Sequence, residues 1–516
     1  MDITDHDRDC AGEDLLLNER IGETEEVEET EEIEETEEIE EIGEIEEIEE
    51  TEEVEETEET EEVEETEETE EVEETEETEE VEETEETEEV EETEEIEEIE
   101  GMRILYSLLI RLYELSILIA SPFSDKAHQW ISGRRNLFEK LASGISKKQK
   151  WIWFHAASLG EFEQGRPLIE LIHSKHPGYG ILLTFFSPSG YLVRKGYPGA
   201  DMVSYMPLDS AGNAKRFIEI VQPVLAVFIK YDIWYHHLAA LDRAGIPVFL
   251  VSAHLRKEQI YFTPAGRFIG DQLRNVSHIF TQSESCAAML RQKGFTHVSH
   301  AGDTRVDRVL AIAAAPKDFS WLKQYMTGAH ILVAGSTWPE DEVRLIPAIH
   351  KTETSLIIAP HEVNEKRIND LESQLPGAKR LSRLKEKAEP TNVVIVDTMG
   401  DLAHLYALGH FAYVGGGFGK GIHNILEPSA YGIPVIIGPR YQKFEEAEAL
   451  LHIGAVRSIT TEEQLAAVIR DFTPPTSRDK IRTEIAAYLE SQRGATERVY
   501  TYLVNGNFID PNRTDK

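Results

Sequence analysis

Cysteine is nearly absent from this sequence of 516 residues, which contains only Cys10 and Cys286. Two thiols cannot supply a disulfide framework, and so low a count is compatible with a reducing compartment. Metal-binding motifs are lacking as well from residues 102–516, since their histidines are scattered and there is neither an H-E-x-x-H motif nor a paired D-x-D. We therefore predict that no metal is bound.

Basic residues are almost missing from residues 1–101, which carry 58 acidic side chains and only two basic ones, Arg8 and Arg20. The net charge of −50 therefore describes this segment and not the rest of the chain. The other 415 residues hold 42 acidic and 48 basic side chains, a charge of +6. A mildly basic body suits an anionic membrane surface or a phosphorylated substrate.

Residues 23–100 repeat a triplet in which one Thr, Val or Ile is followed by two glutamates. A three-residue spacing rotates steadily around a helix, so the Val and Ile side chains never form one apolar face, and the glutamates repel each other. We therefore predict that residues 1–101 form a disordered acidic tail. Two interpretations are open: an acidic decoy for basic partners, or, as we favour, a translated repeat upstream of a working initiator at Met102.

Residues 102–120 are strongly apolar but include Arg111 and Glu114, and they fall short of the ~20 residues that a membrane span needs. No small-residue cleavage signal follows, which argues against a secretory signal peptide. Scattered cations come next: Lys126, Arg134, Arg135 and Lys140. The pattern predicts that residues 102–150 are an anchor helix and linker, with the helix lying in, or dipping into, the cytoplasmic face of a membrane. The alternative is a helix packed against the protein's own core.

Two stretches of the body, residues 151–315 and 316–516, alternate short apolar runs with helical patterns. In the first stretch we expect strands at residues 151–157, 181–186, 203–206, 224–229, 248–251 and 279–282. In the second we expect strands at residues 331–334, 355–359, 393–396, 412–414 and 435–437, and a closing helix at 479–502. This alternation predicts an α/β protein with two Rossmann-like domains that face each other across a cleft.

Residues that could take part in catalysis or in phosphate binding follow an expected strand in each stretch. Glu161 comes after the first strand, where a carboxylate can accept a proton from a substrate hydroxyl. Its position alone favours the simpler interpretation, a first-turn residue that suits the helix dipole. In the second stretch, five glycines between Gly415 and Gly421 lead into a helix expected near Asn424. Such a loop lets backbone N–H groups approach a phosphate, and Glu427 could accept hydrogen bonds from ribose hydroxyls.

Three further segments of the second stretch also follow expected strands: residues 334–337, 359–361 and 397–401. Because ligands bind beyond the carboxyl ends of parallel strands, these segments predict a nucleotide half-site. His236 and His237 have no obvious partner, and we predict that both are structural.

The motifs together resemble the bacterial 3-deoxy-D-manno-octulosonic acid (Kdo) transferase family of lipid A and lipopolysaccharide core assembly. The resemblance covers residue 102 to about residue 503 and rests on the order and spacing of several marks. These are the anchor, HAASLGE at 155–161, PLD at 207–209, GST at 335–337, DTMG at 397–400, Gly415-Gly416, and HNILEP at 423–428. The family has the GT-B glycosyltransferase fold, which agrees with two facing α/β units.

The resemblance implies a membrane-associated inverting transferase that moves Kdo from CMP-Kdo to a lipid A precursor, lipid IVA, without a cofactor and with no nucleic-acid partner. Glu161 matches the family's general base. Asp232 and Arg305 fall at positions associated with transition-state stabilisation, where the family usually has Glu and Lys. The CMP-binding positions map to Pro360, His361, Met399, Gly400, Asp401, Asn424, Ile425, Leu426 and Glu427.

The sequence also departs from the family. The common Pro-Arg-His pattern is reduced to Pro360-His361, so an arginine contact to the donor would come from elsewhere, and the loop at 417–421 is shorter than usual. Two alternatives stay open. One is another GT-B enzyme that uses a UDP-sugar, either a transferase or a 2-epimerase, and the other is a membrane-bound scaffold without turnover.

Overall fold

The computed structural model describes residues 99–147, 149–384 and 389–510. The acidic tail predicted for residues 1–101 lies outside the described residues, apart from its last three. Those three residues are helical, because the N-terminal helix is described from Ile99 to Ala120. Two further helices follow it, α2 (Asp125–Arg134) and α3 (Leu137–Gly144).

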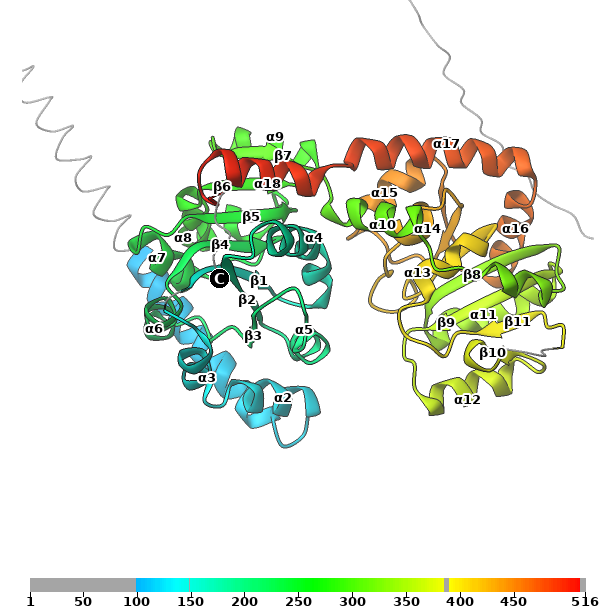
Figure 1. Cartoon of the computed structure of the whole chain (residues 1–516), viewed down its shortest axis with the longest axis horizontal. Coiled ribbons are helices and arrows are strands. Elements are labelled where there is room, and N and C mark those ends of the chain that lie inside the picture. The colour runs from blue at the N-terminus through cyan, green and yellow to red at the C-terminus, as the bar shows by residue number, and fades with distance from the viewer. Residues whose placement is uncertain (1–98, 148, 385–388, 511–516) are drawn as a thin grey trace, which may run out of the picture. The chain divides into compact units, whose positions relative to one another are not determined.

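The first sheet has seven parallel strands in the order β3-β2-β1-β4-β5-β6-β7 (Figure 1). Their bounds are β1 (Lys150–Ala156), β2 (Tyr179–Phe185), β3 (Met202–Tyr205), β4 (Pro223–Ile229), β5 (Val248–Ala253), β6 (His278–Thr281) and β7 (Val298–His300). The accompanying helices are α4 (Leu159–Lys175), α5 (Pro188–Arg194), α6 (Ala211–Val221), α7 (Tyr235–Arg243), α8 (Arg267–Gln272), α9 (Glu284–Gln292) and α10 (Thr304–Ala314). Trp153 and Phe154 enter two different buried clusters, so both faces of this sheet are covered.

The second sheet also has seven parallel strands, in the order β10-β11-β9-β8-β12-β13-β14. Their bounds are β8 (His330–Thr337), β9 (Thr354–Pro360), β10 (Lys379–Arg380), β11 (Val393–Ile395), β12 (Phe411–Val414), β13 (Val435–Ile437) and β14 (Val456–Ser458). The helices are α11 (Pro339–His350), α12 (Glu365–Gln374), α13 (Leu402–Leu405), α14 (Leu426–Ser429), α15 (Glu445–His452) and α16 (Glu462–Phe472). The two parallel sheets confirm the predicted α/β class with two Rossmann-like units.

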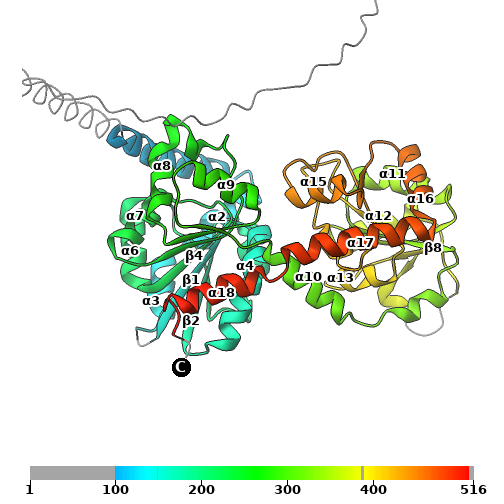
Figure 2. The ribbon, with the colours of Figure 1, turned by 90° about the horizontal axis from the view of Figure 1, so that it is seen from above.

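The closing helix expected over residues 479–502 is in fact two helices, α17 (Pro475–Gln492) and α18 (Ala495–Asn505) (Figure 2). Gly494 separates them with a φ of +83°, a conformation that favours glycine. Apolar side chains of α17 join the core of the second sheet, whereas Val499 and Leu503 of α18 join a core of the first. The last helix was expected with the second unit, but its apolar face is buried against the first.

The N-terminal helix is tied to the first unit by two hydroxyl groups. The Tyr106 hydroxyl donates a hydrogen bond to Asp209 Oδ2 at 2.7 Å, and Ser107 Oγ lies 2.9 Å from His236 Nε2. Asp209 also accepts from His237 Nδ1 at 2.5 Å and from the backbone N–H groups of both histidines. The buried Asp209 is thus the partner that the sequence did not reveal for this histidine pair.

The other face of the same helix is apolar and exposed. The apolar residues on this face that are about half exposed or more are Ile104, Leu105, Leu108, Leu109, Leu112, Leu115, Leu118 and Ile119. Among the described residues, no single helix is both long enough and apolar enough to cross a bilayer. Only the N-terminal helix and α2 taken together meet that test, and they are bent by 119°.

Candidate active site

Glu161 is the third residue of α4, immediately beyond the carboxyl end of β1. Its side chain is half-buried, and the hydroxyl of Ser158, the residue before the helix, donates a hydrogen bond to its Oε2. Oε1 makes no hydrogen bond to any of the described residues. The site therefore offers one fixed and one open carboxylate oxygen at the ligand-binding edge of the first sheet.

Asp232 lies in the turn after β4, where His155 approaches it from the neighbouring strand β1. His155 Nε2 is 2.6 Å from Asp232 Oδ2, and His155 Nδ1 is 2.8 Å from Thr184 Oγ1 on β2. Trp153 Nε1 donates to the same threonine hydroxyl at 2.7 Å. A buried row of polar groups thus runs across three adjacent strands to the Asp232 carboxylate.

His155 Nε2 and Asp232 Oδ2 are in close contact, although their arrangement does not have the geometry of a hydrogen bond. Neither atom has another partner among the described residues. His155 is fully buried, so the carboxylate of Asp232 is held by a rigid strand and not by its own loop alone. The sequence marked His155 as part of a motif but gave it no role.

Arg305 lies at the start of α10 and is held by two carboxylates. Its Nη2 is 2.6 Å from Asp303 Oδ2 and 2.9 Å from Glu446 Oε1 of α15. Burial lowers the pKa of Arg305, but the charges of Asp303 and Glu446 outweigh this effect and raise the pKa above its ordinary value. The guanidinium is therefore charged, and the carboxylates of Asp303 and Glu446 neutralise its charge. Its predicted part in stabilising a transition state stays a prediction.

Three aromatic rings stack at the carboxyl edge of the second sheet. His361, next to Pro360 at the end of β9, lies between Trp338 and His423, with ring centroids 4.6 and 4.3 Å away. Trp338 Nε1 donates a hydrogen bond to His423 Nε2 at 3.1 Å. Burial, together with the neighbouring His361, lowers the pKa of His423 to about 4. His423 is thus neutral at pH 7, with its remaining proton on Nδ1.

The glycine-rich loop is anchored by Asp341, whose side chain is 1% exposed. Asp341 Oδ2 accepts hydrogen bonds from the backbone N–H groups of Trp338 and Gly416, both at 2.9 Å, and Oδ1 accepts from the Tyr413 hydroxyl at 2.8 Å. Gly416 has a φ of +93°, and a Cβ there would lie 2.4 Å from Gly421 O. This carboxylate therefore already occupies the N-terminus of α11 and fixes the shape of the loop.

The helix expected near Asn424 is α14, which has only four residues. So short a helix supplies little dipole, and any phosphate contact has to come from the loop's amides instead. Asn424 Nδ2 donates to Glu427 Oε1 at 3.3 Å, and burial raises the pKa of Glu427. The side chains of Ile425 and Leu426 are fully buried, so only their backbone could meet a donor.

Met399, Gly400 and Asp401 form the turn before α13. Met399 is 81% exposed, and Gly400 has a φ of +83°. Asp401 accepts two hydrogen bonds, from Lys317 Nζ to Oδ1 and from the Thr398 hydroxyl to Oδ2, each at 2.7 Å. Burial raises the pKa of Asp401, but these two bonds outweigh it and lower the pKa below its usual value. Over the described ranges, no group of three or more His, Cys, Asp or Glu side chains could hold a metal ion.

Comparison with known proteins finds similarity to one family. Residues 133–308 match the family described as 3-Deoxy-D-manno-octulosonic-acid transferase (kdotransferase). The 3-deoxy-D-manno-octulosonic acid transferase of Bordetella pertussis is 25% identical over 373 residues, which is 68% of this chain and 86% of the relative. The chain therefore resembles the Kdo transferases. The enzyme of the same name from Aquifex aeolicus is 27% identical over 355 residues, which is 66% of this chain and 92% of that one.

These relatives confirm the resemblance of the motifs and support a glycosyltransferase. Among solved structures, the C-terminal CMP-Kdo binding domain of WaaA from Acinetobacter baumannii is 22% identical and covers 35% of this chain and 98% of that domain, with a TM-score of 0.30. A UDP-GlcNAc 2-epimerase from Neisseria meningitidis is 14% identical and covers 69% of this chain and all of that one, with a TM-score of 0.46. Both TM-scores are below 0.5, so the family assignment rests on the sequence relatives.

Proposed function

We propose that this Kdo transferase moves Kdo from CMP-Kdo to a lipid A precursor, lipid IVA, with inversion at the anomeric carbon, on the cytoplasmic face of the inner membrane. The observation that carries the proposal is the carboxylate of Glu161, which is oriented by Ser158 at the ligand edge of the first sheet. In a Kdo transferase this is a suitable place for the base that acts on the acceptor.

The open Oε1 of Glu161 takes the proton from the attacking sugar hydroxyl of the acceptor. The acceptor oxygen then bonds to the anomeric carbon of Kdo from the side opposite to the phosphate. The bond between the anomeric carbon and the phosphate oxygen breaks, and CMP leaves with the electron pair. One displacement of this kind inverts the anomeric centre, and the proton remains on Glu161.

Asp232 is proposed to act on the sugar in the transition state. The anomeric carbon gains oxocarbenium-like positive charge as the phosphate leaves, and a carboxylate held in place stabilises such charge. His155 keeps Asp232 in position through the 2.6 Å contact. For Arg305 to meet the carboxylate of Kdo, that carboxylate would replace Glu446 as its partner.

The second sheet is proposed to bind CMP. Backbone amides of the loop between Gly415 and Gly421 suit the single phosphate of the donor, and Glu427 suits the ribose hydroxyls. The ring of His361 is stacked between Trp338 and His423, so it offers the donor its exposed edge. One phosphate carries less charge than a diphosphate, so this proposal needs no metal ion.

A membrane location is supported by the N-terminal helix. Its inner face is bonded to Asp209 and His236, so its exposed leucines cannot turn inward to join the protein's core. An apolar face of this length beside basic residues suits a helix that lies in the bilayer interface. This arrangement favours the anchor over the alternative of a helix buried in the protein's own core.

The test uses the full chain in detergent with freshly generated CMP-Kdo and a tetraacylated lipid A precursor, and it follows the mass of the product. We expect a gain of one or more Kdo masses with the wild type, a loss of at least ~100-fold with Glu161→Gln, and full activity with Glu219→Gln, an exposed control on α6. CMP should inhibit and UDP should not. Inhibition by UDP, or transfer from a UDP-sugar alone, would overturn the proposal in favour of another GT-B enzyme.

A further inference from the structure

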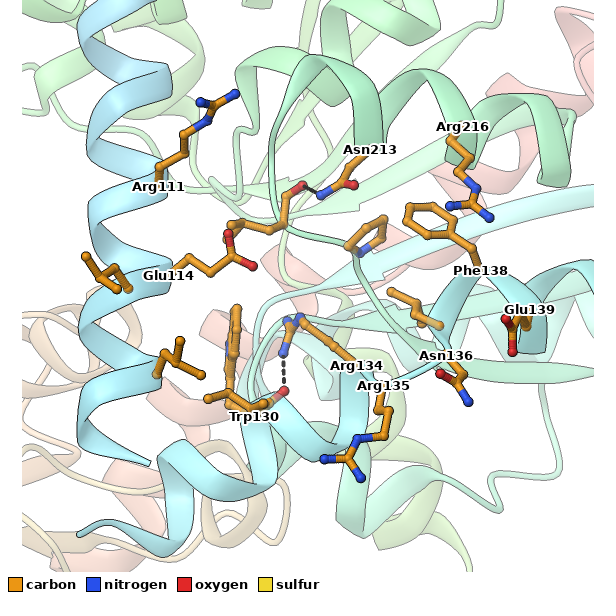
Figure 3. A pocket seen from close by; sticks show the side chains of 16 residues that line it. Arg111, Glu114, Trp130, Arg134, Arg135, Asn136, Phe138, Glu139, Asn213 and Arg216 are labelled. Atoms are coloured by element: carbon orange, nitrogen blue, oxygen red, sulfur yellow. Dashed lines mark hydrogen bonds between the residues drawn. The ribbon is translucent and has the colours of Figure 1, made fainter. Parts of the chain in front are cut away.

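A pocket of about 620 Å³ lies between the N-terminal helix, α2, α3 and the start of α6 (Figure 3). Much of its wall is apolar and comes from the N-terminal helix, α2, α3 and the connection after β3. The apolar residues include Leu115, Leu118, Ile131, Leu137, Phe138 and Leu208. Because Leu115 and Leu118 also belong to the exposed apolar face of the N-terminal helix, the pocket adjoins the surface proposed to lie in the bilayer.

The charged residues of this pocket are mainly cationic. Four arginines, Arg111, Arg134, Arg135 and Arg216, line it together with two glutamates, Glu114 and Glu139. Within the part of the chain that the structure describes, none of the four arginines forms a salt bridge. A pocket with apolar walls and an excess of unpaired cations favours an anionic amphiphile.

Arg134 is the most buried of the four cations. Its guanidinium donates to the backbone carbonyls of Phe186 at 2.7 Å and Met206 at 3.1 Å, and it lies 3.8 Å from the ring centroid of Trp130. Burial lowers the pKa of Arg134 to about 9, because no carboxylate compensates its charge. An anion bound in the pocket would supply that missing compensation.

The pocket shares the edge of the sheet that carries Glu161. Pro207 and Leu208, which line it, follow the carboxyl end of β3, and Glu161 follows the carboxyl end of β1. Only β2 separates these two strands in the sheet. Two strand spacings amount to about 10 Å, which is the length of one or two sugar rings.

We propose that this pocket binds the phosphate-bearing, acylated end of the glycolipid acceptor and so directs its sugar hydroxyl toward Glu161. The arginines bind the phosphate, and the apolar wall takes the first part of an acyl chain as it leaves the bilayer. Glu114 opposes an anion, but it is one turn from Arg111 on the same helix, and the cations remain in excess. This inference rests on the proposed function and adds the subsite that selects an anionic lipid acceptor.

Trp130 lines the pocket and therefore gives a binding signal that does not depend on catalysis. The full chain is mixed in detergent micelles with phosphatidylglycerol whose acyl chains carry bromine, which quenches nearby tryptophan fluorescence. We expect quenching that is largely lost in Trp130→Phe, and we expect the tetraacylated lipid A precursor to reverse it by displacing the brominated lipid. Quenching that the precursor does not reverse would overturn the proposal, because the pocket would then hold an ordinary phospholipid.

Charge reversal at the rim tests the phosphate contact. Arg135→Glu combined with Arg216→Glu should raise the KM for the lipid A precursor at least ~10-fold and weaken its displacement of the brominated lipid, with kcat and the KM for CMP-Kdo unchanged. Arg243→Glu, an exposed arginine on α7 outside the pocket, is the matched control and should change none of these values. Arg134 is not substituted, because it also ties α2 to the strand ends. If the double variant does not fold, Arg216→Ala alone replaces it with the same readouts.

The outcomes separate this inference from the proposed function. Displacement by the precursor without any transfer of Kdo would refute the function and leave the pocket assignment standing. Transfer of Kdo with an unchanged acceptor KM in the double variant would refute the pocket assignment and leave the function standing.

Discussion

The Nε2 atom of His155, in the last-but-one position of β1, lies 2.6 Å from Oδ2 of Asp232 in the turn after β4. The two strands are paired, and His155 itself is fixed by Thr184 on β2. The position of this carboxylate is therefore set by the centre of the first sheet. A residue placed in this way acts on the reaction through Asp232 and does not itself need to touch the substrate.

Replacing His155 should impair turnover more than substrate binding. His155→Asn has no group near the position of Nε2, so Asp232 loses its contact, and we expect kcat to fall ~10–100-fold with the KM for CMP-Kdo nearly unchanged. His155→Gln places an amide nitrogen near that position and should recover much of the loss. Steady-state kinetics of both variants on the lipid A precursor measures the difference.

A buried histidine elsewhere provides the control. His176, at the far end of α4, lies 2.9 Å from the Tyr500 hydroxyl and has no link to Asp232. His176→Asn should lower the melting temperature without lowering kcat. Equal losses of kcat in His155→Asn and His155→Gln would contradict the positioning role.

Trp338 should matter for donor affinity through His423. Trp338→Phe keeps a ring against His361 but removes the Nε1 donor that fixes the His423 ring. We expect CMP to bind ~3–10-fold more weakly, with the KM of the acceptor unchanged, because one hydrogen bond that preorganises the site is lost. Isothermal titration with CMP measures the effect, and Trp321→Phe in the same unit is the control. An unchanged affinity would show that the stacked rings lie outside the donor site.

Local patterns were sufficient to predict much of the fold. The strand at 435–437 was predicted to the residue, because turn residues flank its apolar run. Strands β7, β10 and β14 were missed because these short strands are mostly polar and lack an apolar run such as that of β13. The break at Gly494 was missed because the helical pattern continues on both sides of it.

The same distinction applies to the site. Glu161 could be placed from the sequence, because a strand end and a helix start adjoin it. The hydrogen bond from Trp338 to His423 joins residues 85 positions apart, and no local pattern reports such a contact. The two carboxylates on Arg305 come from different segments in the same way. Only the packed structure brings these groups together.

The exposed leucines of the N-terminal helix should control membrane binding. Leu105→Glu, Leu109→Glu and Leu112→Glu together place three charges on a face that is about half exposed, so the fold should be unaffected. Burial of each leucine in the interface is worth ~1–2 kcal/mol, and we expect the membrane-bound fraction to fall at least tenfold. Sedimentation of membranes followed by immunoblotting measures the fraction. Leu192→Glu, on α5, is the exposed control, and a triple variant that stays in the membrane pellet would contradict the interfacial placement.

Three histidines that are buried or partly buried should make the folded state less stable in mild acid. Burial lowers the pKa of His278, His410 and His423 to about 4, against ~6.5 in an unfolded chain. Between these values the unfolded state binds more protons, so this stabilisation is complete above about pH 6.5 and is lost as the pH falls toward 4. His410 Nδ1, for example, accepts a hydrogen bond from the backbone N–H of Ile331 at 3.1 Å and cannot do so once protonated.

Urea unfolding should therefore give a lower free energy of unfolding at pH 5 than at pH 7, and the combined His278→Gln and His410→Gln variant should show a smaller difference. An equal difference in that variant would mean that other groups, such as paired carboxylates, set the pH dependence.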